Sequence, residues 1–254
     1  MKALLHMPVV DKKIRGKINK ELTKVFGDNF IEVIIGGAAF NPEIESFFKK
    51  IGFRYTVGYG MTECGPIITY DGWKNNKLYS SGKATINMKV RIDSPDPQNI
   101  VGEVHTKGPN VMLGYFKNEE ATINQFTADG WMKTGDLGII DKNGYLFLKG
   151  RNKSLILGPS GQNIYPEEIE SKINTSSYVV ESIIVEQNDK IVALVYPDFD
   201  LLKEEQKDPE ETMNELLTLV NAELPVYSQI AKIKIHPEEF EKTPKRSIKR
   251  FVYQ

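Results

Sequence analysis

Two short polar segments place side chains capable of metal, phosphate or sugar chemistry directly after apolar stretches. Glu63 supplies a carboxylate, and magnesium prefers oxygen ligands. Its neighbour Thr62 supplies a hydroxyl that can donate to a phosphate oxygen. Asp136 follows Thr134-Gly135, and its two carboxylate oxygens can accept hydrogen bonds from two neighbouring hydroxyls. Taken alone, each segment also fits an ordinary polar turn.

Two further residue types could take part in such chemistry. Arg151 carries a planar, permanently charged guanidinium that suits a phosphate or a sugar, or it is a surface residue at a strand end. Cys64 is the only cysteine, which excludes an internal disulfide. We expect a buried structural thiol there, since no histidine lies near it in the sequence to activate a nucleophile.

The elements that must position these side chains begin with a predicted β-α-β unit over residues 30–57. Apolar runs at 30–35 and 53–57 read as buried strands, and between them Asn41 and Pro42 open a helix that Gly52 ends. A crossover of this kind implies parallel strands, and such sheets bind ligands beyond the carboxyl ends of their strands. Those ends are the segments 36–39 and 58–63. Upstream, apolar residues recur every four positions from Val10 to Phe26, which predicts an amphipathic helix ended by Gly27.

Downstream the pattern changes twice. Short alternating stretches from about 83 to 148 predict a small antiparallel barrel or sheet. After 150–153 we expect a helix at 166–173, strands near 180–186 and 191–196, a helix around 210–222 and a strand at 231–236. The predicted fold class is mixed α/β and α+β in several domains: the end of a large α/β subdomain (1–80), a β-rich, barrel-like subdomain (81–150) and a C-terminal α+β domain (151–254).

The amino-acid composition limits the binding partners and the cellular compartment that we expect. The 33 basic and 34 acidic residues leave a formal charge of −1, so no whole-chain field favours nucleic acid or an anionic membrane. The first ten residues only faintly imitate a secretory leader, and no apolar run approaches the ~20 residues needed to span a bilayer. A single cysteine fits a reducing compartment, so we expect a cytoplasmic protein that contacts a membrane, if at all, peripherally.

Three separated segments carry a resemblance to a known family. Residues 59–63 (Tyr-Gly-Met-Thr-Glu) resemble the Y-G-x-T-E motif of adenylate-forming enzymes, the superfamily of acyl-CoA synthetases, luciferases and peptide-synthetase adenylation domains. Residues 130–138 and the Gly150-Arg151 pair are similar to that family's T-G-D and G-R segments in order and spacing. Residues 161–170 look most like bacterial long-chain fatty-acid–CoA ligases.

The resemblance implies that the protein activates a fatty acid with ATP, gives an acyl-AMP and transfers the acyl group to coenzyme A. Glu63 would hold Mg²⁺ as the catalytic carboxylate and Thr62 would bind a phosphate oxygen. Asp136 would bind the ribose and Arg151 the ribose or phosphate. Residues near adenine and the acyl chain would be Gly37, Ala38, Tyr59 and Gly60.

For the last domain the resemblance implies movement. Lys153 falls where the family has its hinge residue, so that one site serves both half-reactions by exchanging the face that covers it. Ser160 and Gly161 would line the passage for the pantetheine arm. A solvated loop lysine and a plain turn are the local alternatives for these positions.

Two departures from the family pattern are visible. The family's catalytic lysine belongs to a C-terminal motif, and alignment of that motif puts Ser247 at the lysine position. Lys245 or Lys249 could substitute for it, and we favour Lys245. This basic tail is also compatible with a solvated run or a patch facing coenzyme A phosphates or acidic lipid. The Gly- and Ser/Thr-rich loop that wraps the ATP phosphates in the family has no counterpart here. We therefore expect a C-terminal fragment that does not turn over alone.

Two alternatives remain open. The chain would be a non-catalytic module that keeps nucleotide or acyl-CoA binding, or a ligase for another carboxylic acid or for a carrier-protein thiol. The small-molecule partners are the fatty acid, ATP and coenzyme A; nucleic acid is not expected, and no protein partner is predicted.

Overall fold

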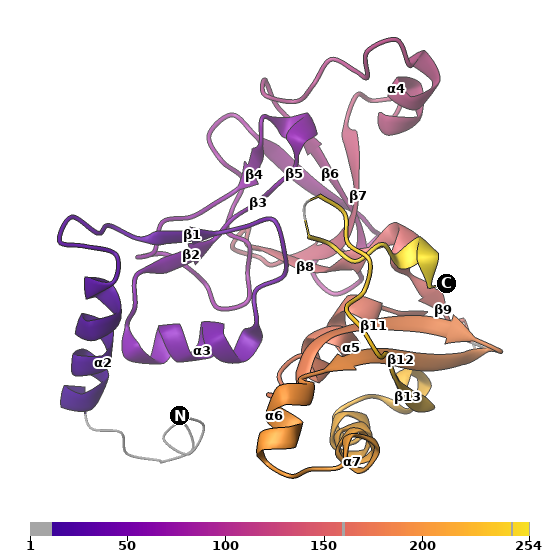
Figure 1. The fold of residues 1–254 in the computed structure, drawn as a ribbon. Coiled ribbons are helices and arrows are strands. Elements are labelled where there is room, and N and C mark those ends of the chain that lie inside the picture. Colours follow the sequence, from indigo (N-terminus) through magenta and orange to yellow (C-terminus); the bar gives the residue numbers. More distant parts are fainter. Residues whose placement is uncertain (1–11, 159–160, 245, 254) are drawn as a thin grey trace. The chain divides into compact units, whose positions relative to one another are not determined.

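The structure is a computed structural model that describes residues 12–158, 161–244 and 246–253. The chain divides into two compact units, Met1–Leu148 and Lys149–Gln254 (Figure 1). No helix within the described ranges is both long and apolar enough to cross a membrane.

The first unit begins with the expected β-α-β arrangement. Its elements are the helices α2 (Lys12–Lys24) and α3 (Pro42–Ile51) and the strands β1 (Val33–Ile35) and β2 (Tyr55–Val57). The two strands pair in parallel, with Val33 opposite Tyr55, which confirms the prediction. The Asn41 side chain accepts hydrogen bonds from Glu43 N and Ile44 N, and Gly52 ends α3 in the left-handed conformation at φ 71°.

The apolar faces of this region hold together around a cluster of aromatic rings. Ile51, Phe53 and Tyr55 are buried there, and Ile18 and Leu22 of α2 pack against them. Of the other residues in the pattern of every fourth position, Ile14 is about half exposed and Val10 lies outside the described residues. Phe26 is also about half exposed, but its ring lies 5.0 Å from that of Phe30 and 5.8 Å from that of Phe53. The core contacts therefore come from Ile18 and Leu22 of α2 and from Phe26 just after it.

The rest of the first unit is a hairpin and a larger sheet. The hairpin joins β3 (Tyr59–Gly60) to β4 (Ile67–Thr69). The sheet has the order β5-β6-β7-β8, with β5 (Lys89–Asp93), β6 (Gly102–Lys107), β7 (Met132–Ile140) and β8 (Leu146–Arg151), whose last three residues already belong to the second unit. Helix α4 (Glu119–Gln125) lies between β6 and β7 in sequence. No ladder joins β5 to β8 among the residues described, so the barrel-like expectation is wrong. Alternation fixes which side chains share a face, whereas closure depends on pairing between distant edges.

Tyr59 links the hairpin to the larger sheet. Its side chain packs both against the cluster of Cys64, Ile68, Met88 and Met132 and against the cluster of Ile92, Val104 and Leu146. The segment that follows β2 is therefore fixed on β5–β8 by apolar burial.

The second unit is a three-stranded sheet covered by helices. Its sheet has the order β11-β12-β13, built from β11 (Val179–Gln187), β12 (Lys190–Pro197) and β13 (Lys232–Ile235), beside the short pair β9 (Ile156–Leu157) and β10 (Asn163–Ile164). The helices are α5 (Pro166–Ile173), α6 (Phe199–Glu204) and α7 (Pro209–Ala222). In this unit α5 packs on β11 and α7 on β13 (Figure 1).

The C-terminal tail is attached to this second unit by ion pairs and by a small hairpin. Lys242 forms an isolated antiparallel β-bridge with Ile248, and its Nζ lies 2.9 Å from Glu181 Oε2. Further on, Arg250 contacts Glu170 of α5, and its Nη1 donates to Ile184 O at 3.4 Å. We refer to residues 242–244 and 246–248, whose outer ends the β-bridge joins, as the tail hairpin. It is attached at Lys242, and Arg250 attaches the chain two residues past its end.

Candidate functional site

The carboxyl ends of β1 and β2 lie side by side, as parallel pairing requires. Gly58 N donates to Ile35 O at 2.8 Å, and a Cβ on Gly36 would come within 3.3 Å of Gly58 O. Gly37 follows with φ 85°, and Gly36 to Ala39 are all exposed. Two of the sequence-predicted residues, Gly37 and Ala38, therefore lie at the open end of the parallel pair.

Tyr59 and Asp136 are 77 positions apart in sequence and meet in the structure. The Tyr59 hydroxyl donates to Asp136 Oδ2 at 2.7 Å. Burial, together with the Asp136 charge, raises the pKa of Tyr59 far above its usual range, so this phenol stays protonated and remains a donor. Asp136 is only half-buried, which leaves its carboxylate within reach of a ligand.

Gly60 lies where the hairpin permits no side chain. A Cβ there would come within 2.0 Å of Pro66 O, so the residue is required for the close approach of β3 and β4. Thr62 and Glu63 then form a short 3-10 turn, Thr62–Cys64, with Thr62 exposed and Glu63 half-buried. The turn presents the hydroxyl and the carboxylate on the same unit as Asp136.

Glu63 is held by a residue that sequence reasoning missed. The Tyr115 hydroxyl donates to Glu63 Oε1 at 3.1 Å and lies 3.4 Å from Gln125 Oε1. Burial and this contact raise the pKa of Tyr115. The only available signal was the Gly114-Tyr115 pair after an apolar stretch, which does not reveal a contact 52 positions away.

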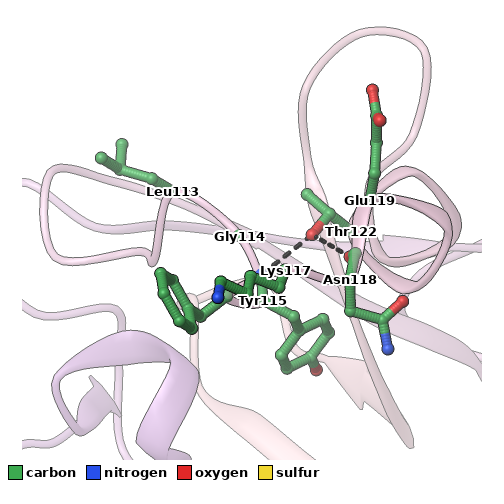
Figure 2. A pocket seen from close by; sticks show the side chains of 8 residues that line it. Leu113, Gly114, Tyr115, Lys117, Asn118, Glu119 and Thr122 are labelled. Carbon is green, nitrogen blue, oxygen red and sulfur yellow. Dashed lines mark hydrogen bonds between the residues drawn. The ribbon is translucent and has the colours of Figure 1, made fainter.

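Figure 2 shows how the loop that carries Tyr115 is braced. Thr122 Oγ1 accepts from Tyr115 N at 2.9 Å and donates to Asn118 O at 2.8 Å. A Cβ on Gly114 would come within 2.6 Å of the Thr122 side chain, so the loop closes tightly on α4. The shallow hollow beside it is lined by eight residues, Leu113, Gly114, Tyr115, Phe116, Lys117, Asn118, Glu119 and Thr122.

The donor set fits a magnesium ion that arrives with a phosphate ligand. One oriented carboxylate, Glu63, and one hydroxyl, Thr62, are offered, and magnesium commonly takes one or two carboxylates and completes its shell with phosphate and water. No cluster of three or more His, Cys, Asp or Glu side chains suited to a metal occurs in the ranges that the structure describes. A site of this kind depends on the ligand for most of its oxygens.

The remaining predicted residues belong to the second unit or lie outside the described residues. Arg151, Lys153 and Gly161 are exposed, and Gly161 adopts φ 81°. Lys249 is engaged, with its Nζ 3.1 Å from Glu241 Oε2. Ser160 and Lys245 are outside the described residues. The structure thus brings Tyr59 and Asp136 into contact.

Cys64 is fully buried, which agrees with a structural thiol. Desolvation, with a smaller contribution from Glu63, raises the pKa of Cys64 to about 11. Because the thiolate is the reactive form, its fraction at pH 8 falls by about 100-fold relative to an ordinary cysteine. We expect Ellman's reagent to label native protein at least 100-fold more slowly than protein in 6 M guanidinium. Equal rates would contradict the burial.

Comparison with known protein families gives two matches. A family model described as AMP-binding enzyme matches residues 5–116, and one described as AMP-binding enzyme C-terminal domain matches residues 153–253. The stretch between them contains Asp136 and Arg151.

Curated relatives cover the chain in part. A 2-succinylbenzoate–CoA ligase of Bacillus cytotoxicus is 38% identical over 160 residues, 61% of this chain and 33% of that protein. The long-chain-fatty-acid–CoA ligase FadD15 of Mycobacterium bovis is 30% identical over 168 residues, 66% of this chain and 27% of that protein. The chain spans a third or less of the length of these two relatives.

Solved structures agree with this comparison. The o-succinylbenzoate CoA synthetase MenE of Bacillus subtilis, in complex with the acyl-adenylate intermediate OSB-AMP, has a TM-score of 0.77 at 26% identity. The match covers 94% of this chain and 49% of that one. The same synthetase in complex with ATP and a magnesium ion has a TM-score of 0.74 at 25% identity, over 92% of this chain and 49% of that one.

Proposed function

Because the chain belongs to the AMP-binding enzyme superfamily, we propose that it supplies the ribose- and magnesium-binding part of an acid–CoA ligase. Such a ligase activates a carboxylic acid with ATP to an acyl-AMP and transfers the acyl group to coenzyme A. The contact between Tyr59 and Asp136 is the observation that supports this most, because it joins two motifs of the resemblance into one site.

Each residue of this site has a separate task in the proposal. Asp136 accepts hydrogen bonds from the two ribose hydroxyls, while the Tyr59 hydroxyl fixes one of its oxygens. Glu63, oriented by Tyr115, takes one coordination position of magnesium, and Thr62 donates to a phosphate oxygen. Magnesium, when bound, neutralises charge on the phosphates. Gly37 and Ala38 leave the backbone open to adenine and the acyl chain, and Gly60 permits the close approach of β3 and β4 that carries the next motif.

The second unit supplies the proposed lid. Arg151 contacts the ribose or phosphate, Lys153 is the hinge, and Ser160 with Gly161 lines the passage for the pantetheine arm. The adenylating cation is Lys245 or Lys249. For Lys249 this requires release from Glu241, whose oxygen lies 3.1 Å from the ammonium.

Long-chain fatty acid is the substrate that we propose, in the cytoplasm and with at most peripheral contact with a membrane. It is supported by the likeness of residues 161–170 to long-chain ligases and by relatives named for that activity. Other relatives are named for 2-succinylbenzoate and 4-coumarate.

An acid panel tests the function and its substrate. We expect residues 1–254 alone to give no ATP–pyrophosphate exchange, because no Gly- and Ser/Thr-rich phosphate loop is found in the sequence. A longer form of the protein that carries such a loop is expected to release AMP at least tenfold faster with palmitate than with 2-succinylbenzoate, 4-coumarate or 2-methylpropanoate. Robust exchange by 1–254, or preference for another acid, would contradict the corresponding part of the proposal.

A non-catalytic binding module is the second candidate. Ser247 stands where the family has lysine, and Lys249 is paired with Glu241. Acid-dependent AMP release by any form of the protein would exclude it.

A further inference from the structure

Asp136 lies in an irregularity of β7. Glu103 pairs with Leu137 and His105 with Lys133, so two steps along β6 correspond to four along β7. Thr134, Gly135 and Asp136 therefore leave the regular ladder as a β-bulge, which bends a strand and re-aims its side chains. We call residues 134–136 the β7 bulge. The direction in which Asp136 points depends on how this bulge is held.

Side chains replace the ladder partners that the β7 bulge gives up. Gly135 N donates to Glu103 Oε1 at 3.0 Å, and Asp136 N donates to Thr134 Oγ1 at 3.1 Å. The Thr134 hydroxyl in turn donates to Val104 O at 2.8 Å. Within the described residues, Glu103 thus lies outside the bulge and accepts a hydrogen bond from its backbone through its side chain.

Gly135 cannot fix the bulge by packing. Its φ of 76° favours glycine, and no atom lies within 4 Å of a Cβ built there. Glycine retains wide conformational freedom, so a hydrogen bond to its amide restrains the bulge where packing does not. The Glu103 carboxylate provides that bond, and it is charge-assisted.

Glu103 is itself oriented by a chain of polar groups that leads to the surface. Arg91 Nε donates to His105 Nδ1 at 3.4 Å, which leaves the imidazole proton on Nε2. That Nε2 is buried without a hydrogen-bond partner and lies 3.6 Å from Glu103 Oε2. Arg91 is fixed by two bonds to Asp129, at 2.6 and 3.1 Å, and stacks 4.6 Å over Trp131. The carboxylate is thereby directed toward Gly135.

We propose that Glu103 is a positioning residue for Asp136: its carboxylate holds the β7 bulge, and His105 and Arg91 hold the carboxylate. The inference rests on the proposed function for the claim that Asp136 binds ribose, whereas the claim about the bulge stands on the geometry alone. Glu103 does not touch the ligand in this assignment.

Three variants of residues 1–254 test it by two measurements. Glu103→Ala removes the acceptor, Glu103→Gln keeps an oxygen acceptor without the charge, and Glu120→Ala removes an exposed carboxylate of the same unit as a control. The first measurement is hydrogen exchange and chemical shift of the Gly135 and Asp136 amides by NMR. The second is calorimetric titration with a non-hydrolysable acyl-adenylate mimic.

In Glu103→Ala we expect the Gly135 amide protection factor to fall at least tenfold and the affinity for the mimic to fall about tenfold. Glu103→Gln should recover both to within about threefold, and Glu120→Ala should change neither. Unchanged amide shifts of Ile92 and Leu146, in the core of the same sheet, would show that the Ala variant remains folded.

Three results would overturn the inference. The first is a Gly135 amide that is as protected from exchange in Glu103→Ala as in the wild type. The second is a Glu103→Gln variant that loses as much amide protection and affinity as Glu103→Ala. The third is lost protection with undiminished affinity for the mimic. If the wild-type chain binds no mimic, the proposed function fails for this chain, and the amide signals of Gly135 and Asp136 still decide whether Glu103 holds the bulge.

Discussion

Replacing Asp136 with alanine is expected to weaken binding of a non-hydrolysable acyl-adenylate mimic by roughly 100-fold. Two hydrogen bonds from ribose hydroxyls to a carboxylate are lost, each worth roughly 1.5 kcal/mol, and tenfold in affinity corresponds to about 1.4 kcal/mol. The Tyr59 hydroxyl, 2.7 Å from Asp136 Oδ2, also loses its acceptor. Isothermal titration of residues 1–254 measures the difference.

Asp136→Asn provides the matched comparison for this experiment. The amide keeps one oxygen for Tyr59 or the ribose, so we expect it to bind within about tenfold of the wild type. Asp28→Ala, which removes an exposed carboxylate from the same unit, should bind like the wild type. Equal binding by Asp136→Ala and the wild type would refute the ribose assignment. No binding by the wild type would mean that the proposed function fails for this chain alone, because the pocket would then require residues outside it.

Replacing Arg250 with methionine is expected to destabilise the second unit by about 3 kcal/mol. Glu170 is 8% exposed, its Oε1 accepts from Ile184 N at 2.6 Å, and Arg250 contacts its other oxygen. Removing one partner of a buried pair leaves an uncompensated charge, which typically costs about 3–5 kcal/mol. Hydrogen exchange of the β11 and β12 amides measures the loss in that unit.

The effect of Arg250→Met should depend on pH in a defined direction. Burial raises the pKa of Glu170, and the Arg250 charge opposes that rise. Without the arginine the folded-state pKa rises further above the unfolded value. A raised pKa gives stability that is present below the unfolded pKa and is lost as pH rises through the folded pKa. The destabilisation should therefore be smaller at pH 5 than at pH 8.

Two comparisons separate this effect from loss of packing. The double variant Glu170→Leu with Arg250→Met removes both charges and should recover most of the stability. Lys249→Met breaks the more exposed pair with Glu241 and should cost less than about 1 kcal/mol. The role assigned to Arg250 would be contradicted if Arg250→Met lost no more stability than Lys249→Met. It would also be contradicted if the stability lost in Arg250→Met did not change with pH.

Local signals in the sequence were sufficient for several elements. The helix after Asn41 and Pro42 begins and ends where its caps indicate, and the helix predicted at 166–173 is α5. The strands on either side of Asn188-Asp189 also form, with one residue added at each end of the first. In these cases a cap, a proline or a turn residue acts within a few positions, so the sequence carries the information directly.

The features that depend on distant pairing were not predictable in the same way. The contact between Tyr59 and Asp136 spans 77 positions, and the Glu103 contact with Gly135 spans 32. The β7 bulge appears only once the register between β6 and β7 is known. The barrel failed for the same reason, because the alternating pattern of residues 83–148 specifies faces and not which edges meet.

The two attachments of the tail hairpin have a consequence for how this protein can change over generations. Lys242 fixes its first residue and Arg250 fixes the chain two residues past its last, whereas Pro244, Arg246 and Ser247 between them are exposed. Substitutions at exposed positions away from caps and cores usually change stability by less than about 0.5 kcal/mol. Lysine at 247, the position that the resemblance aligns with the family's lysine, can thus be gained or lost by one amino-acid change. Selection on activity at this position is then separated from selection on folding.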